Sequence, residues 1–376
     1  MLKISFRISF LLLLLLISFR SAALKPAGVD LRNHPPRIIR TCCMFGSRVG
    51  VVMVPFLRLS AITSTAAMGD HSFLGGSGEK NGVVYTRRGG FIDMGHLRDQ
   101  ADWTAYLFSL LEEEQPRGFL TRNLGFEGGE KSLQVIIPAD YGPEELLHLA
   151  GRMAYDLSVW HEIATWFGVS SVPLVPEQYS SFSPEDVYSN LLGVFLGMEA
   201  IRSDLPYDEA MTLLVRQKME ELEAVDSEDA TASAMESVRD LWWTRVRRYP
   251  SSKVVMLRHP SPYDPVCPYL IPAAPGDTLF GDPVCLPAVS SLCCSADTLY
   301  ELAIRLNHKL PFQSLFPGRG ERRITQRDFD TLVTQIRKEY ETGFLVPGRI
   351  RDDNSAGDSP QRKGRKKKSK AEKKRI

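Results

Sequence analysis

Two histidines in this sequence have acidic neighbours at spacings that suit metal binding or proton transfer. His161 is followed directly by Glu162, and Trp160 and Trp166 flank the pair. A His-Glu pair on a helix suits either a metal ion or an acid-base step. A zinc protease helix places a second His four residues after the first, but here that position is Thr165. The pair therefore needs ligands from another part of the chain.

The segment from Asp93 to Asp102 is the best source of such ligands. His96 and Asp99 are three residues apart, which places them on one face of a helix. Asp93 precedes His96 by three residues, and Asp102 follows Asp99 by three. So many ionisable groups on nearly one stripe are unusual for a helix whose other face is apolar. We therefore expect this segment to supply partners for His161.

Three interpretations of these residues stay open. In the first, His96 and His161 bind a divalent metal such as zinc. Glu162 is then the base or third ligand, and Asp99 orients a ligand. In the second, His161 forms a metal-free acid-base pair with Glu162 or Asp99. In the third, the residues are structural: Asp93 caps a helix, Asp99 pairs with Arg98 or a neighbour, and His161 is hydrogen-bonded at the edge of the core.

Other motifs narrow the chemistry. No Gly-x-Ser-x-Gly elbow and no phosphate-binding loop occur, which disfavours serine esterases and nucleotide-binding enzymes. Asp186 and Asn190 are one helical turn apart, and Gly193 and Gly197 continue their stripe. Small residues at this spacing predict close packing against another helix, and Asp186 could also serve as a metal or substrate ligand.

Hydrophobic periodicity predicts a predominantly helical α+β fold, with several packed helices and a few short strands in the N-terminal third. Asp93 and Ser183 are expected to cap helices, because their side chains accept the amide hydrogens of a first turn. The predicted helices are Met94–Glu114, Pro143–Phe167, Pro184–Arg202, Asp208–Val225, Asp229–Arg248, Ala296–His308 and Thr325–Thr342.

The predicted strands are short. They are Val49–Leu57, Val83–Thr86 with the nearby Phe91–Asp93, and Ser132–Pro138. Residues 118–129 contain many turn-forming residues and are expected to be a connector. Residues 260–287 contain many prolines and are expected to be a long loop.

The N-terminus has the pattern of a secretory signal peptide. Lys3 and Arg7 precede an apolar run, and Ser21 to Ala23 provide small residues for cleavage after Ala23. The run is shorter than the ~20 residues of a membrane-spanning helix. We expect residues 1–23 to be a signal peptide, residues 24–350 to be a single exported domain, and the protein to be periplasmic or associated with the envelope.

Six cysteines are expected to form disulfides in an exported protein. No Cys-x-x-Cys motif occurs, which disfavours a structural zinc site. Cys267 and Cys285 end two copies of Asp-Pro-Val-Cys within one loop, and a local bridge between them is reasonable. Buried thiols that stay reduced are the alternative.

The C-terminus is a polybasic tail attached to an ordinary globular composition. Residues 361–376 contain ten Lys or Arg and one Glu, although the net charge of the whole chain is only +1. From residue 351 the chain has few apolar residues, so 351–376 should be disordered. No aromatic residues interleave the basic ones, so we expect binding to anionic envelope polymer or lipid headgroups and no specific nucleic acid.

Four strings resemble a bacterial family that is classified only as a domain of unknown function, DUF4056. They are CCMFG, RRGGFIDMGHLRDQADWTAY, YDLSVWHEIATWFG and SSFSPEDVYSNLLG. The resemblance covers most of residues 35–345 and does not include the basic tail. It implies an exported envelope protein with a single domain, and it implies no particular reaction.

These observations favour a metal-assisted hydrolase of an envelope component. His96 and His161 are the expected ligands, with catalytic roles for Glu162 and Asp99. The alternative is a non-catalytic envelope-binding or structural protein that acts through its polybasic tail.

Overall fold

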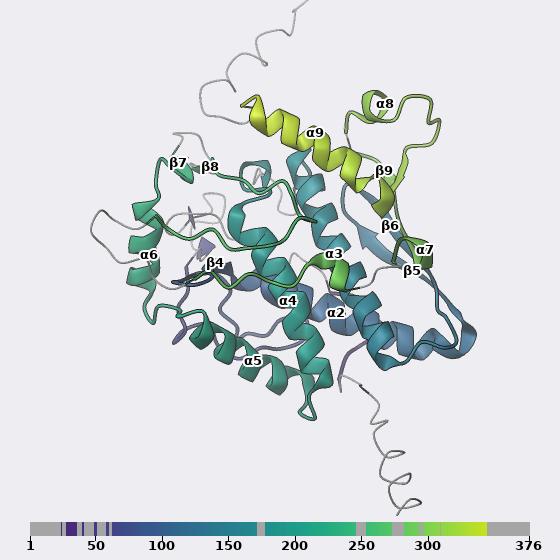
Figure 1. Cartoon of the computed structure of the whole chain (residues 1–376), viewed down its shortest axis with the longest axis horizontal. Coiled ribbons are helices and arrows are strands. Elements are labelled where there is room, and N and C mark those ends of the chain that lie inside the picture. The colour runs from purple at the N-terminus through teal and green to yellow at the C-terminus, as the bar shows by residue number, and fades with distance from the viewer. Residues whose placement is uncertain are drawn as a thin grey trace, which may run out of the picture.

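Figure 1 shows the computed structural model of the chain. The described residues are 24, 28–35, 40, 49–50, 58–59, 62–170, 177–245, 253–272, 282–292, 296–308 and 310–343. The expected signal peptide, most of the expected strand Val49–Leu57, four of the cysteines and the basic tail lie outside the described residues. Of that strand, only β1 (Val49–Gly50) is described, paired with β2 (Arg58–Leu59).

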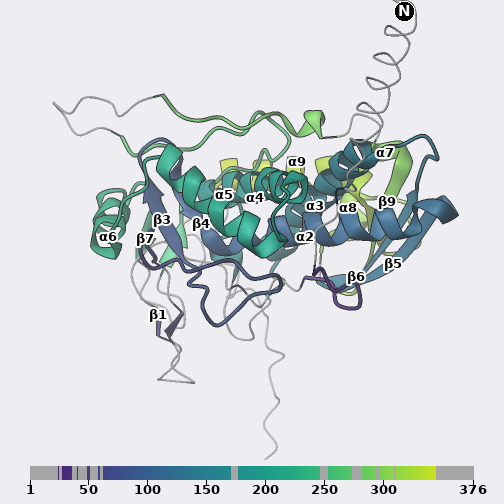
Figure 2. The same cartoon turned by 90° about the horizontal axis from the view of Figure 1, so that it is seen from below.

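Three long helices lie side by side in the middle of the molecule (Figures 1 and 2). They are α2 (Met94–Glu114), α3 (Pro143–Trp166) and α4 (Pro184–Arg202). Their bounds confirm the predicted helices to within a residue. α2 begins at the Asp93 cap, and α3 is followed by Gly168, whose φ of 89° breaks the helix.

The contact between α2 and α4 is unusually close because α4 presents glycines to it. A Cβ atom built on Gly193 would lie 2.0 Å from the carbonyl oxygen of Leu97, and one on Gly197 would lie 2.8 Å from the Cα of Ala101. No other residue fits at these two positions without moving a helix. The predicted role of the small-residue stripe in helix packing is therefore confirmed.

A four-stranded antiparallel sheet lies at one end of the helices, beside α9 (Phe329–Glu341; Figure 1). Its strand order is β10-β9-β6-β5. The strands are β5 (Phe119–Phe126), β6 (Gly129–Ile136), β9 (Tyr300–Leu306) and β10 (Arg323–Thr325).

Of the four strands of this sheet, only β6 was predicted; β5, β9 and β10 were not. Residues 296–308 were expected to be a helix, but only α7 (Ala296–Leu299) is helical and β9 follows it. The sequence of β9 is compatible with either state, and pairing with both β6 and β10 decides it. Residues 118–129 were expected to be a connector, but β5 buries Leu120 and Leu124 while it exposes Phe119 and Phe126. Strands are therefore not confined to the N-terminal third.

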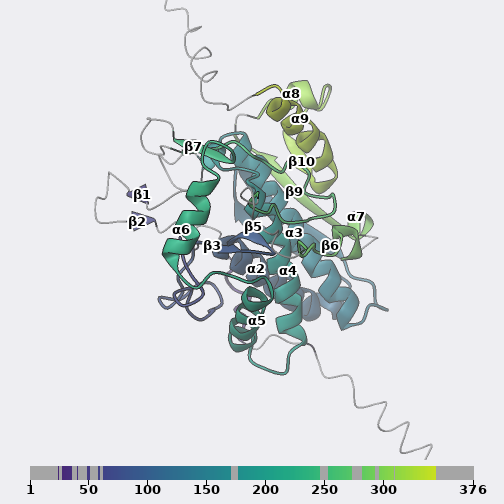
Figure 3. The same ribbon diagram turned by 60° about the vertical axis from the view of Figure 1, so that its left-hand side comes forward.

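The opposite end of the molecule carries shorter elements (Figure 3). The hairpin of β3 (Val83–Thr86) and β4 (Gly90–Asp93) leads into α2. The helices and strands that follow α4 there are α5 (Tyr207–Glu221), α6 (Glu228–Ser237), β7 (Trp243–Arg245) and β8 (Lys253–Val255). In chain order, a further short helix, α8 (Phe312–Leu315), lies between β9 and β10, and Figure 1 shows it near α9.

The helix expected over Asp229–Arg248 is wrong in its second half. α6 ends at Ser237, and Asp240 has a φ of 65°, which a helix does not allow. Trp243 is fully buried, and its indole N–H donates to the carbonyl oxygen of Met235 at 2.9 Å. Burial of this large aromatic side chain accounts for the turn in the chain.

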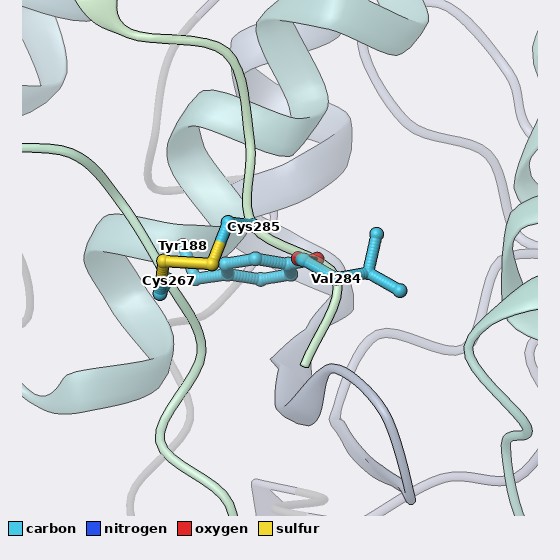
Figure 4. Close-up of a disulfide and its surroundings, with 4 residues drawn as sticks. All are labelled: Tyr188, Cys267, Val284 and Cys285. Carbon is cyan, nitrogen blue, oxygen red and sulfur yellow. Dashed lines mark hydrogen bonds between the residues drawn. A yellow bond between two sulfur atoms is a disulfide. The ribbon is translucent and has the colours of Figure 1, made fainter. Parts of the chain in front are cut away.

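A disulfide joins Cys267 to Cys285, as the repeated Asp-Pro-Val-Cys motif suggested. Figure 4 shows the bridge beside the ring of Tyr188 from α4. The Tyr188 hydroxyl donates to the carbonyl oxygen of Val284 at 2.8 Å. The bridge and this hydrogen bond hold two stretches of the proline-rich loop against α4.

The largest cluster of buried apolar side chains joins α2, α3 and α4 to the inner face of the sheet. A smaller cluster, centred on Trp242 and Trp243, lies under α6 and the β3–β4 hairpin. The single domain over residues 24–350 stays a prediction. Among the described residues, none of the helices combines the length and apolarity needed to span a bilayer.

Candidate metal centre

The first turn of α2 fixes the position of His96. Asp93, at the end of β4, accepts hydrogen bonds through Oδ1 from the backbone N–H groups of Gly95 (2.7 Å) and His96 (3.1 Å). Its own N–H donates to the hydroxyl of Ser189 on α4 at 2.9 Å. The predicted cap is confirmed, and it holds His96, whose exposed fraction is 3%, at the contact between α2 and α4.

The last turns of α3 position His161 and Glu162, which are both buried. Thr165 occupies the place of the second histidine in a zinc protease helix. Its hydroxyl donates to the carbonyl oxygen of His161 at 2.9 Å, which is ordinary behaviour for a threonine within a helix. Any further ligands must therefore come from outside α3.

α2 brings His96 to this end of α3. The ring centroids of His96 and His161 are 5.9 Å apart. His96, His161 and Glu162 each offer one ligand atom, and these atoms lie within 4.8 Å of one another. Two imidazoles and one carboxylate form a ligand set typical of catalytic zinc. Three of the four predicted site residues are thus brought together.

His161 is oriented by a carboxylate that sequence reasoning missed. Its Nδ1 lies 2.6 Å from Oε1 of Glu127, and the other oxygen of Glu127 accepts from Nζ of Lys131 at 2.9 Å. An ionised carboxylate only accepts, so the hydrogen of a neutral His161 ring resides on Nδ1. The ring therefore presents its Nε2 lone pair to the cluster.

Two aspartates lie within ion-pair distance of His96. Its Nδ1 lies 2.8 Å from Oδ1 of Asp186 on α4 and 3.4 Å from Oδ2 of Asp93. These three residues also satisfy the distance requirement of a metal cluster. Because they meet at Nδ1 of His96, the simplest interpretation is that the two aspartates hold the ring while Nε2 points to His161 and Glu162.

Glu162 is held by the backbone of a neighbouring loop. Its Oε2 accepts a hydrogen bond from the N–H of Phe182 at 2.7 Å. Phe182 has a φ of 54°, which is rare for a residue with a side chain, and it is completely buried. The strained backbone conformation at Phe182 places this N–H against the carboxylate and fixes the direction of the third ligand.

The surroundings of the cluster are acidic. Glu185 follows Phe182 at the start of α4, and burial together with the charge of Asp186 raises its pKa well above the ordinary value. The Ser183 hydroxyl donates to Oδ2 of Asp186 at 2.8 Å. Several carboxyl groups thus share a small buried volume, which is costly unless protons or cations offset their charge.

The guanidinium of Arg258 is buried, and the charges of these carboxylates act on its pKa. Burial lowers its pKa to about 10, and the charges of Glu162, Asp186 and Glu185 oppose that shift. It donates hydrogen bonds to the carbonyl oxygens of Ser181 and Tyr179 and to the hydroxyl of Ser181. Arg258 therefore offsets part of the negative charge of these carboxylates.

Asp99 is not in this cluster. Its Oδ1 accepts from Nη1 of Arg40 at 3.2 Å, and the same nitrogen donates to Asp102 at 2.7 Å. Asp99 is thus paired, as the structural interpretation expected, but the partner is Arg40, 59 residues away, where Arg98 or a neighbour was predicted. This placement does not support a role of Asp99 as an orienter of the ligands. Asp186 and Glu127 take that role.

Glu127 and Arg258 are functional candidates that the sequence did not reveal. Glu127 lies in the turn between β5 and β6, within residues 118–129, for which the sequence predicts a turn-rich connector. Gly128 has a φ of 64°, and a Cβ atom there would lie 2.8 Å from a side-chain carbon of Val169. The sequence feature that could have pointed to Glu127 is its Glu-Gly-Gly turn. Because glycines let a turn approach a helix closely, the glutamate beside them can reach a side chain on that helix.

Comparison with known proteins gives a family and no function. The profile of a family described as "Protein of unknown function (DUF4056)" matches residues 31–272. That range includes all of the residues placed in the cluster. No curated protein and no solved structure matches the chain.

Proposed function

The chain belongs to this DUF4056 family of proteins of unknown function, and we propose that it is a metal-assisted hydrolase. In this proposal His96 and His161 bind a divalent ion such as zinc through Nε2, and Glu162 supplies the third ligand. The signal-peptide pattern supports the envelope as the place of action, and this part of the proposal is based on the sequence alone.

The observation that carries the proposal is the pair of carboxylates behind the two imidazoles. Glu127 contacts Nδ1 of His161 and Asp186 contacts Nδ1 of His96. Histidines that bind metals almost always donate their other ring N–H to such an acceptor. Two histidines with this arrangement, facing each other beside a backbone-held glutamate, are hard to explain by packing alone.

The negative charge of the buried carboxylates also suits a divalent cation. The carboxylates of Glu162 and Asp186 are buried, and a divalent cation would offset their charge. A divalent ion held there supplies Lewis acidity, which polarises a carbonyl or phosphoryl oxygen. The protein's part is to orient the imidazoles through Glu127 and Asp186 and to fix Glu162 through the N–H of Phe182.

The test is metal analysis of the purified protein after equilibration with zinc. We expect a stoichiometric amount of metal in the wild type and none in His161→Ala or His96→Ala. His148→Ala is the matched control, because His148 lies on α3 and its ring contacts the backbone oxygens of Ser291 and Leu292 and the side chain of Arg202. Equal metal content in the wild type and His161→Ala would overturn the ligand assignment.

A second variant tests the orienting carboxylate. Glu127→Gln keeps the shape of the side chain but removes its charge, and loss of such a partner typically weakens metal binding about 10- to 100-fold. Glu130→Gln, on the exposed side of the same hairpin, should bind zinc like the wild type. Competition with a chromogenic chelator measures both affinities. Identical affinities in the two variants would remove the main support for the proposal.

A further inference from the structure

A cavity of about 440 Å³ lies beside the candidate metal centre. Small-molecule sites typically measure about 300–1,000 Å³. Its walls come from the β5–β6 hairpin, the middle of α2, the residues that follow α3 and β9, and the 34–35 segment. They include Trp103, Phe126, Glu127, Lys131, Asn307 and His308. Glu127 belongs to both places, because the same carboxylate contacts His161.

Charged ligands are disfavoured in this cavity. Lys131 and Glu127 form a salt bridge of 2.9 Å, so their charges offset each other. A further wall residue, His34, has a lowered pKa, first because it is partly buried and then because Lys131 and Arg122 repel a proton on its ring. A neutral His34 adds a polar group without adding a charge.

A wholly apolar ligand is disfavoured as well. The Lys131–Glu127 pair, the exposed amide of Asn307 and two imidazoles line the walls. An apolar ligand would remove water from these groups and give them no partner. The lining therefore favours a neutral ligand that carries many hydroxyl or amide groups.

The side chain of Phe126, in the cavity wall, offers a ligand an apolar contact surface. Phe126 is 65% exposed, although a phenyl ring of this size is normally covered. A sugar ring combines an apolar C–H face with hydroxyl groups around its edge. Such a ring can cover Phe126 while its hydroxyls reach Asn307 and the Lys131–Glu127 pair.

We propose that this cavity binds a neutral saccharide. Saccharide binding as such needs no metal. Its role as the substrate subsite of the hydrolase rests on the proposed function, and it follows from the position of Glu127 between the cavity and His161. The substrate class would then be a glycan with an uncharged ring next to the bond that is cleaved.

The experiment is a binding screen of the metal-stripped protein on an array of neutral and acidic oligosaccharides. Calorimetry on the tightest neutral binder follows, with metal-stripped and zinc-loaded protein. Phe126→Ala should weaken its binding roughly five- to tenfold, the usual worth of one aromatic contact. Phe119→Ala is the matched control, because Phe119 lies on the same strand, is 61% exposed and is not part of the cavity wall.

The outcomes separate the two proposals. A neutral binder that depends on Phe126 and not on Phe119 supports the saccharide site, whether or not the protein binds zinc. An array without neutral binders, binding of acidic glycans only, or equal affinities in Phe126→Ala and Phe119→Ala would each overturn it. None of these results bears on the metal content of His161→Ala, which tests the metal centre separately.

Discussion

At the scale of single residues, the site depends on where protons and charges are held. Glu127 accepts the Nδ1 hydrogen of His161, Asp186 lies within ion-pair distance of Nδ1 of His96, and a backbone N–H fixes Glu162. Glu185 is different, because burial and the neighbouring Asp186 disfavour its charged form. The buried carboxyl groups that favour a cation at the cluster therefore destabilise the folded protein when no cation is bound.

Glu185→Gln should make the stability of the metal-free protein less sensitive to a rise in pH. The folded state raises the pKa of Glu185 above its ordinary 4.5, so the unfolded state gives up its proton first. Stability is then fully present below that value and falls as the pH rises toward the folded pKa, by about 1.4 kcal/mol per unit of difference. The glutamine variant should lose this decline, measured as the free energy of unfolding between pH 5 and pH 8.

The control for that measurement is Glu199→Gln, an exposed carboxylate near the end of α4. Its pH dependence should follow the wild type. A Glu185→Gln protein whose stability declines with pH as steeply as the wild type would show that Glu185 is ionised in the fold without penalty.

At the scale of elements, the site is an intersection of three helices. α2 brings His96, α3 brings His161 and Glu162, and α4 brings Asp186. The glycines of α4 set how closely α2 approaches, and so they set the distance between Asp186 and His96.

Gly193→Ala should destabilise the protein despite the helix preference of alanine. Alanine gains about 1 kcal/mol over glycine in a helix. Its Cβ would lie 2.0 Å from the carbonyl oxygen of Leu97, so the helices must separate, and overpacking of this kind costs about 1–3 kcal/mol. We expect a lower midpoint in urea unfolding. Gly320→Ala is the control, because nothing lies within 4 Å of its new Cβ and the midpoint should stay unchanged. Equal midpoints for Gly193→Ala and the wild type would show that α2 and α4 tolerate the wider spacing.

At the scale of the whole molecule, Arg40 ties the N-terminal part of the chain to two aspartates of α2, Asp99 and Asp102. Its guanidinium contacts Glu79 (2.7 Å), Asp99 and Asp102, and it donates to the carbonyl oxygen of Ser72 at 2.7 Å. Burial alone would raise the pKa of Asp102, but Arg40 and His71 hold it below the ordinary value.

Arg40→Ala should cost about 3–5 kcal/mol of unfolding free energy, because it leaves buried carboxylates without their cation. Arg32→Ala is the control: Arg32 pairs with Asp30, but its side chain is 89% exposed, so its loss should leave the free energy of unfolding nearly unchanged. Chemical unfolding at neutral pH measures both. A similar small loss in the two variants would mean that Arg98 or solvent replaces Arg40.

Export and the binding of anionic envelope components by the basic tail remain predictions at this scale. They depend on residues 1–23 and 351–376, which lie outside the described part of the chain. The family match ends at residue 272, before the tail begins.

The sequence by itself determined the features that depend on near neighbours. Asp93 starts α2, Gly168 follows the end of α3, the glycine stripe of α4 allows its close contact, and the repeated Asp-Pro-Val-Cys motif identified the disulfide pair. In each case the deciding contact or backbone conformation is encoded within a few residues, or in a repeat that is visible along the chain.

Tertiary structure alone decided the rest. β9 is a strand because β6 and β10 flank it, and no local preference in Tyr300–Leu306 fixes that pairing. Asp99 pairs with Arg40 and not with the histidines, although it lies on the same helix as His96. Glu127 reaches His161 because the β5–β6 turn folds back onto α3, 34 residues along the chain. Side chains that meet over such separations are brought together by packing, which spacing along the sequence does not encode.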